Sequence, residues 1–159
     1  MNIYFSCAIT GGRQDQVIYA ALVEALLEDG HEVPTAHLSN PSVMEAEAIV
    51  SPQDVYVRDV SWVKACDVVV AEVSTPSHGV GYEIALAISS GKPVLCCYQE
   101  SRRVSKMITG NSSPGLQVFS YRTPEELVKR IRVCLKQVEG DLRQQQAPNN
   151  GRPTGVTAS

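Results

Sequence analysis

Residues 67–83, DVVVAEVSTPSHGVGYE, indicate the fold of the whole chain. After Asp67 the segment to Ala71 is wholly apolar, which is typical of a parallel strand covered by helices on both faces. Residues 77–81 form a glycine-containing loop, and a helix is expected over about residues 82–90. A strand, a loop and a helix in this order are the repeating unit of a parallel α/β sheet.

The same alternation continues on both sides of this segment. Further strands are expected at residues 2–8, 31–37, 93–98 and 117–119, and further helices at 14–29, 51–65, 104–109 and 123–139. Residues 38–50 are interpreted as a polar loop. The pattern predicts a doubly wound α/β fold, with a five-stranded, mainly parallel Rossmann-like sheet and helices on both faces.

Capping residues mark the starts of two of these helices. Ser51 precedes Pro52, which suits a first helical position, and Thr123 begins a capping-box pattern. From Gly140 onward the chain is rich in small and polar residues. We therefore expect one catalytic domain over residues 1–139 and a disordered tail over residues 140–159.

Composition narrows the possible function classes. The chain has 159 residues, 43% of them hydrophobic, and a net charge of −3, which argues against binding of a nucleic-acid polymer. The five cysteines show no metal-ligand spacing, so we expect no metal and no cofactor. No signal peptide and no membrane span is evident, which predicts a cytoplasmic or nuclear protein and no membrane partner.

The loops that follow the strands should meet at one edge of the sheet, where such folds bind ligands. Ser77, Gly79 and Gly81 precede a predicted helix, whose N-terminus favours anions. They could form a phosphate cradle or an ordinary turn. Arg13, after Gly11 and Gly12, could bind phosphate or lie on the surface.

Three carboxylates are candidates for chemistry. Glu83 is expected in the first helical turn, either complementing the helix dipole or acting as a nucleophile kept ionised by it. Asp59 lies on or beside an apolar stripe, so it either needs a partner or points to solvent. Glu72 ends a strand and could instead accept a backbone hydrogen bond there.

Two further side chains could belong to the site or to the bulk of the protein. Tyr4 lies inside the first strand, where a tyrosine is either core or a hydrogen-bonding group. His37 follows the second predicted strand and either lines the pocket or is solvated.

Taken together, the segments IYFSCAITGGR (residues 3–13), RDVSWVKACDVVVAEVSTPSHGVGYE (58–83) and RRVSKMITG (102–110) resemble a known family. They are similar to the 2′-deoxynucleoside 5′-phosphate N-hydrolases, a branch of the nucleoside 2-deoxyribosyltransferase superfamily. The resemblance covers roughly residues 3–135. It implies hydrolysis of the bond between base and sugar in 2′-deoxynucleoside 5′-monophosphates.

The resemblance also implies a role for individual residues. Glu83 matches the nucleophile that attacks C1′, Tyr4 would orient it, and Asp59 would act as an acid or hold the deoxyribose. Phosphate contacts would come from Ser77, Gly79 and Gly81. Ser105 and Met107 match residues that reach the site of a neighbouring subunit, which implies a homodimer.

The first loop departs from the family pattern. The family has glycine, serine, isoleucine and arginine where this chain has Cys7, Ala8, Ile9 and Thr10. A hydroxyl and a guanidinium are therefore missing near the substrate, and Arg13 and Lys106 are candidate replacements for the charge. Three alternatives stay open: a deoxyribosyltransferase, a ribonucleotide N-glycosidase and a non-catalytic nucleotide-binding module.

Overall fold

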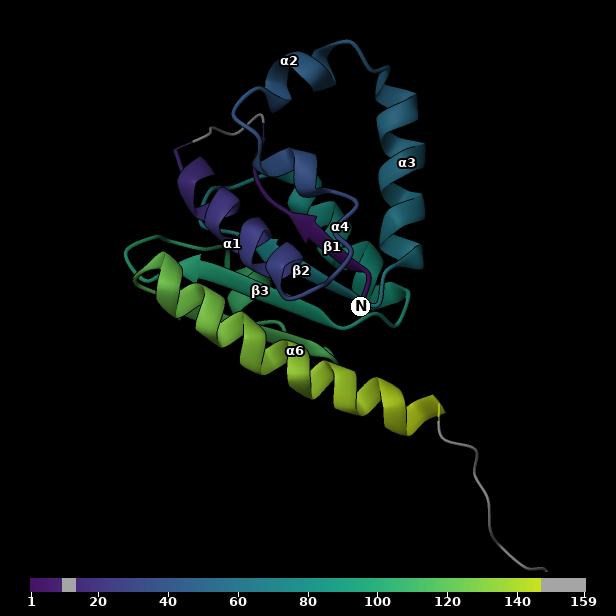
Figure 1. The fold of residues 1–159 in the computed structure, drawn as a ribbon, viewed down its shortest axis with the longest axis vertical. Helices are drawn as coiled ribbons and strands as arrows, with labels where there is room; N and C mark the ends of the chain where they lie inside the picture. Colours follow the sequence, from purple (N-terminus) through teal and green to yellow (C-terminus); the bar gives the residue numbers. More distant parts are fainter. Residues whose placement is uncertain (10–13, 147–159) are drawn as a thin grey trace, which may run out of the picture.

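A computed structural model describes residues 1–9 and 14–146 and contains a parallel sheet between two layers of helices (Figure 1). The described strands are β1 (Ile3–Ser6), β2 (Val68–Glu72), β3 (Val94–Gln99) and β4 (Leu116–Tyr121), in the order β1-β2-β3-β4. Tyr4 pairs with Val69, and Val70 pairs with Leu95. All carboxyl ends therefore lie at one edge, where the predicted loops meet.

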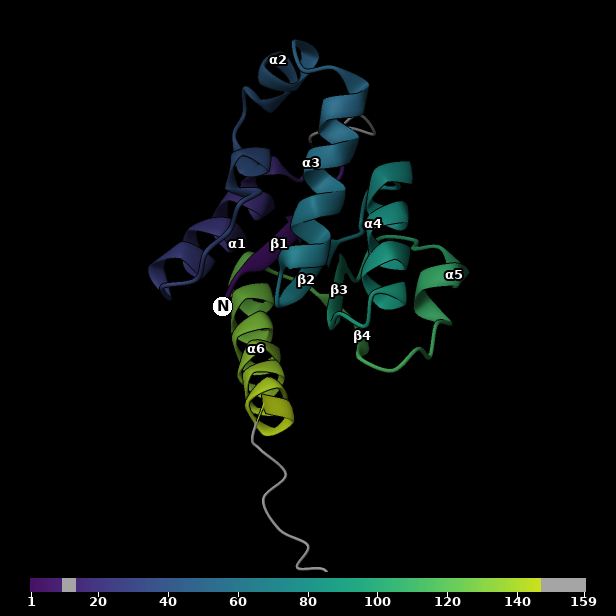
Figure 2. The ribbon, with the colours of Figure 1, turned by 90° about the vertical axis from the view of Figure 1, so that its right-hand side faces the viewer.

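Helices cover both faces of this sheet, as predicted. Their bounds are α1 (Gln16–Glu28), the 3-10 helix η1 (Ala36–Ser39), α2 (Val43–Ala48), α3 (Pro52–Ala65), α4 (His78–Ser89), α5 (Lys106–Thr109) and α6 (Pro124–Gln146). Helices α1 and α6 pack together on one face, whereas α3 and α4 contact each other on the other (Figure 2). In the described part of the chain, no helix is long and apolar enough to cross a bilayer.

The core is divided by the sheet into two clusters. Strand β1 shows how, because side chains of a strand alternate between faces. Ile3 and Phe5 pack with Leu22 of α1 and Ile131 of α6. Tyr4 instead packs with Val63, Val80 and Ile84, beneath α3 and α4. The candidate site develops on this second face.

The structure corrects four of the sequence predictions. The described strands number four, because residues 31–37 contribute only a bridge between Asn2 and Glu32 before η1 begins. Residues 38–50 include α2 rather than forming only a loop. Helix α4 begins at His78, so Gly79 and Gly81 are helical. Helix α6 continues to Gln146, so residues 140–146 are not part of a disordered tail.

Tertiary packing accounts for the last two of these differences. Glycine is a poor helix former, but the cap at Ser77 and the burial of Val80 and Ile84 hold the first turns of α4 in place. The buried side chain of Val138 anchors α6 near Gly140, and the helix continues through Leu142, which packs against the core. Tertiary packing thus overrides local propensity at both places.

Candidate active site

Glu83 lies in the second turn of α4 with its carboxylate directed at the end of β1. The Tyr4 hydroxyl donates a hydrogen bond of 2.8 Å to Oε1, and the Ser6 hydroxyl donates to Oε2. Each carboxylate oxygen therefore has its own hydroxyl donor, which holds the group in one orientation.

The local sequence explains why these two hydroxyls lie side by side. Tyr4 and Ser6 are two residues apart in a strand, so both point to the α3–α4 face. Both are buried, and Ser6 pairs in register with Ala71 of β2. The sequence interpretation singled out Tyr4 and missed Ser6, although the period of two would have identified it.

The environment of Glu83 favours its protonated form more than water does. Burial raises the pKa of Glu83 above its usual range, the hydrogen bonds from Ser6 and Tyr4 lower it, and the charge of Asp59 raises it. Burial and the nearby Glu83 also raise the pKa of Tyr4, which stays a hydroxyl donor. The prediction that Glu83 lies in the first helical turn is wrong, because α4 begins at His78 and Glu83 falls in its second turn, where the helix dipole acts more weakly.

A small cavity of about 150 Å³ lies between α3 and α4, and the catalytic candidates Asp59 and Glu83 both line it. It is lined by Tyr56, Asp59, Val60, Val63, Gly79, Tyr82, Glu83 and Leu86. The Asp59 side chain is 21% exposed and accepts a hydrogen bond of 2.8 Å from Nε of Arg58. Two carboxylates, one hydrogen-bonded to hydroxyls and one paired with a guanidinium, therefore line the same cavity.

The segment 77–81 caps α4 and borders this cavity. The Ser77 hydroxyl accepts a hydrogen bond of 3.4 Å from the Val80 amide, and it keeps its own hydrogen for donation. A Cβ added at Gly79 would meet only Ser77 Oγ, at 3.8 Å, and one added at Gly81 would meet nothing within 4 Å. Packing inside the described chain therefore does not require either glycine.

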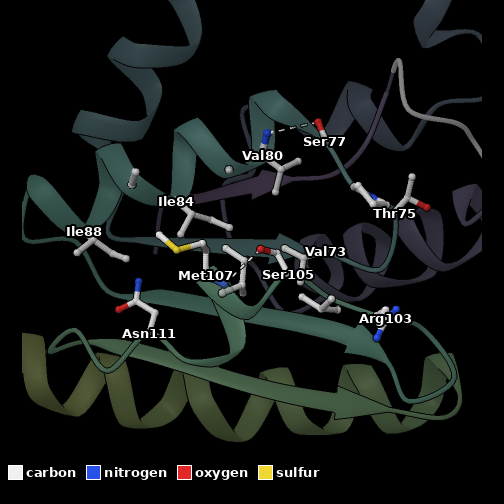
Figure 3. Close-up of a pocket in the computed structure, with 15 residues that line it drawn as sticks. Val73, Thr75, Ser77, Val80, Ile84, Ile88, Arg103, Ser105, Met107 and Asn111 are labelled. Atoms are coloured by element: carbon white, nitrogen blue, oxygen red, sulfur yellow. Dashed lines mark hydrogen bonds between the residues drawn. The ribbon is translucent and has the colours of Figure 1, made fainter.

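A larger cavity of about 360 Å³ lies on the other side of α4, facing α5 (Figure 3). Ser77 and Gly81 line it together with Ser105 and Met107. Ser105 caps α5 by accepting a hydrogen bond of 3.2 Å from the Met107 amide, and Met107 is 81% exposed. The predicted phosphate-binding residues thus lie between the two cavities, with Gly79 on the Glu83 side.

The first loop is only partly described. Gly11, Gly12 and Arg13 lie outside the described residues. The Cys7 side chain packs in the α1–α6 core, and Ala8 is fully buried, whereas Ile9 is partly exposed.

His37 lies against α3, with its ring centroid 6.1 Å from that of Trp62. Trp62 is one turn from Asp59, which puts His37 on the same side of the sheet as the two carboxylates. His37 does not line the cavity that contains Glu83.

A buried polar network lies below the loops, and sequence reasoning found only one of its members. The carboxylate of Glu72 accepts hydrogen bonds from the Ser74 amide and from the Tyr121 hydroxyl at 2.8 Å. Burial raises the pKa of Glu72. This is the strand-end role that the sequence allowed, and it leaves Glu83 and Asp59 as the cavity carboxylates. No group of three or more His, Cys, Asp or Glu side chains that could hold a metal occurs in the described residues.

Comparison with known proteins identifies the family to which this chain is similar. The family model described as nucleoside 2-deoxyribosyltransferase matches residues 3–147. The 5-hydroxymethyl-dUMP N-hydrolase of Danio rerio is 42% identical over 129 residues, which cover 79% of this chain and 90% of that protein. The protein of the same name from Rattus norvegicus is 40% identical over 129 residues, covering 78% of each chain.

A solved structure gives the same fold. The Clostridium botulinum CMP N-glycosidase BcmB superposes with a TM-score of 0.65 at 23% identity, covering 84% of this chain and 99% of the other. At that identity the likeness supports the architecture alone. The arrangement of a sheet between layers of helices is thus that of a known α/β fold.

Proposed function

Because the chain belongs to the nucleoside 2-deoxyribosyltransferase family, we propose that it hydrolyses the N-glycosidic bond of 2′-deoxynucleoside 5′-monophosphates. The products are the free base and 2-deoxyribose 5-phosphate. The names of the two vertebrate relatives support a nucleotide rather than a nucleoside as substrate, because 5-hydroxymethyl-dUMP carries a 5′-phosphate.

One observation carries the proposal: Glu83 is held by two hydroxyls in a cavity that it shares with Asp59. Displacement at an anomeric carbon passes through an oxocarbenium-like state, which a nearby carboxylate stabilises. The hydroxyls of Tyr4 and Ser6 orient that carboxylate without neutralising it. Asp59 is the second carboxyl group that such a reaction uses.

The proposed reaction has two steps. A Glu83 oxygen bonds to C1′ while the C1′–N bond breaks, and its electron pair leaves with the base, which takes up a proton from an acid such as Asp59 or from solvent. Water then attacks C1′, the ester to Glu83 breaks, and one water proton is released. Glu83 returns as a carboxylate, and the net reaction consumes one water.

The 5′-phosphate is proposed to bind at segment 77–81. A glycine inside a helix costs about 1 kcal/mol relative to alanine, and no close contact within the described chain requires a glycine at position 79 or 81. These positions keep the backbone N–H groups at the helix N-terminus accessible to an anion. A second copy of the chain is proposed to add Ser105 and the exposed Met107, which makes the active form a homodimer.

The direct test is a panel of deoxynucleoside 5′-monophosphates, with release of free base measured by chromatography. We expect release from at least one of them, and a much lower kcat/KM for the matching unphosphorylated nucleoside, because the phosphate supplies binding energy away from the reacting bond. Ribonucleotides and an added acceptor base complete the panel.

Each alternative gives a different result in this panel. A transferase releases base only when an acceptor base is present, and a ribonucleotide N-glycosidase prefers the ribonucleotides. A binding module binds nucleotide tightly without turnover. Absence of base release from every deoxynucleotide at high enzyme concentration would rule out the proposed hydrolase.

Ser6→Ala is expected to move the acidic limb of the kcat/KM profile to higher pH. The Ser6 hydroxyl stabilises the Glu83 carboxylate and lowers its pKa, so removing that hydroxyl raises the pKa. Because the nucleophile reacts when ionised, activity should then appear only at higher pH. The measurement is a pH profile of base release. A limb that stays in place, or moves to lower pH, would show that Ser6 does not act on Glu83.

A further inference from the structure

Asp15 occupies the N-cap position of α1, yet its side chain does not cap that helix. Its backbone carbonyl accepts hydrogen bonds from Ile18 and Tyr19, while the carboxylate turns inward. The residue is only 4% exposed. An aspartate at this position would ordinarily bond to the first N–H groups of the helix near the surface, so its burial needs another explanation.

The carboxylate of Asp15 connects segments that follow three different strands. Oδ2 accepts a hydrogen bond of 2.9 Å from the Thr75 hydroxyl, after β2. Oδ1 accepts one of 2.7 Å from the side-chain amide of Gln99, at the end of β3, and lies 3.6 Å from Nη2 of Arg102. Asp15 itself begins the helix that follows β1. A single buried group therefore joins three loops at the carboxyl edge of the sheet.

Of the residues that contact Asp15, Thr75 is the one that lies just before segment 77–81 in the chain. The backbone amide of Val73 donates a hydrogen bond to the carbonyl of Cys97. The Ser74 hydroxyl accepts a hydrogen bond of 2.8 Å from the backbone amide of Gln99. Each residue from Val73 to Thr75 is thus held by a neighbouring segment. Only Pro76, whose ring restricts its φ angle, separates Thr75 from Ser77. Thr75 and Ser77 line the same cavity (Figure 3).

We propose that Asp15 is a positioning residue that holds segment 77–81 ready for the substrate phosphate through Thr75. This inference rests on the proposed function, because segment 77–81 is the proposed phosphate site and Asp15 reaches it only through Thr75. A group held in its bound geometry before the ligand arrives loses less freedom on binding. The bond from Thr75 to Asp15 therefore contributes to nucleotide affinity and leaves the reacting carboxylates unchanged.

The test compares Thr75→Val with Thr123→Val, two identical changes of a hydroxyl for a methyl group. Thr123 caps α6 by accepting a hydrogen bond of 3.2 Å from Glu126 and has no part in the Asp15 contacts, so it is the matched control. Loss of one hydrogen bond predicts that Thr75→Val raises KM and the Kd of a deoxynucleoside 5′-monophosphate roughly 3- to 10-fold, with little change in kcat. Thr123→Val should leave all three unchanged.

Asp15→Ala should raise Kd further, since it removes the acceptor of Thr75 and of Gln99 together. Asp15→Asn should keep most of the nucleotide affinity that Asp15→Ala loses. The asparagine carbonyl can accept a hydrogen bond from Gln99, and its amide can donate one to the Thr75 hydroxyl. Should Asp15→Ala fail to fold, the two threonine variants still decide the question. For the unphosphorylated deoxynucleoside, Thr75→Val should leave kcat/KM unchanged.

Two results would overturn the inference: an unchanged Kd in Thr75→Val, whether or not kcat falls, or an equal loss for phosphorylated and unphosphorylated substrates. Calorimetric Kd values separate this inference from the proposed function. A wild-type protein that binds the nucleotide without cleaving it refutes the hydrolase, while the Kd of Thr75→Val still tests Asp15. A wild-type protein that binds no nucleotide overturns both.

Discussion

Glu83→Gln should reduce kcat for base release at least about 10³-fold, while the deoxynucleotide still binds. Glutamine has the size of glutamate and can still accept a hydrogen bond from Tyr4, but its amide oxygen is a poor nucleophile. The fold should survive, because burial already penalises the charge of Glu83 and glutamine carries none. The rate is measured by chromatography of the free base, and the Kd by calorimetry.

Glu24→Gln is the matched control, since it is the same change at an exposed position on α1 and should leave kcat unchanged. A second measurement concerns the proposed ester. Acid-quenched wild-type enzyme should carry a deoxyribosyl phosphate adduct on the peptide that contains Glu83, and Glu83→Gln should carry none. If Glu83→Gln retained more than a tenth of the wild-type kcat, Glu83 could not be the nucleophile.

Asp59→Asn should lower kcat about 10²- to 10⁴-fold, the usual range for loss of an acid–base group. It should also move the acidic limb of the kcat/KM profile to lower pH. The negative charge of Asp59 raises the pKa of Glu83, so its removal lets Glu83 ionise in more acidic solution. This shift is opposite in sign to the one expected for Ser6→Ala.

Asp54→Asn provides the control for this prediction, because Asp54 lies on the same helix and is exposed near its start. Its rate and its pH profile should match those of the wild type. The fall in kcat and the shift of the acidic limb can be separated by comparing substrates with different leaving bases. For a base that departs without protonation, Asp59→Asn should reduce kcat less. A variant with normal kcat and an unshifted limb would show that Asp59 acts on neither the base nor Glu83.

The sheet could be predicted from sequence because its signals are local. A buried parallel strand must be apolar on both faces, as residues 68–71 are, and the start of α3 is marked by Ser51 and Pro52. Gly30, with a φ of +79°, ends α1 where its lack of a side chain permits that conformation. Where local signals and packing disagreed, as at the start of α4 and near Gly140 in α6, packing determined the structure.

The candidate site was predicted less completely, because its residues are distant in sequence. Glu83 and Tyr4 were both identified from sequence, but their hydrogen bond joins residues 79 positions apart. Ser6 was missed although it shares a strand face with Tyr4. Asp15 was not singled out from sequence, and nothing in its neighbourhood predicts a carboxylate buried against Thr75 and Gln99.

The amino-acid sequence by itself determined the alternation of strands and helices and the edge at which the loops gather. These follow from hydrophobic period and from capping residues, which act within a few positions of the chain. Only the tertiary structure decided which groups surround Glu83, which way its pKa moves, and that Asp15 ties three loops together. Burial and hydrogen bonding between distant segments exist only once the sheet has brought β1, β2 and β3 side by side.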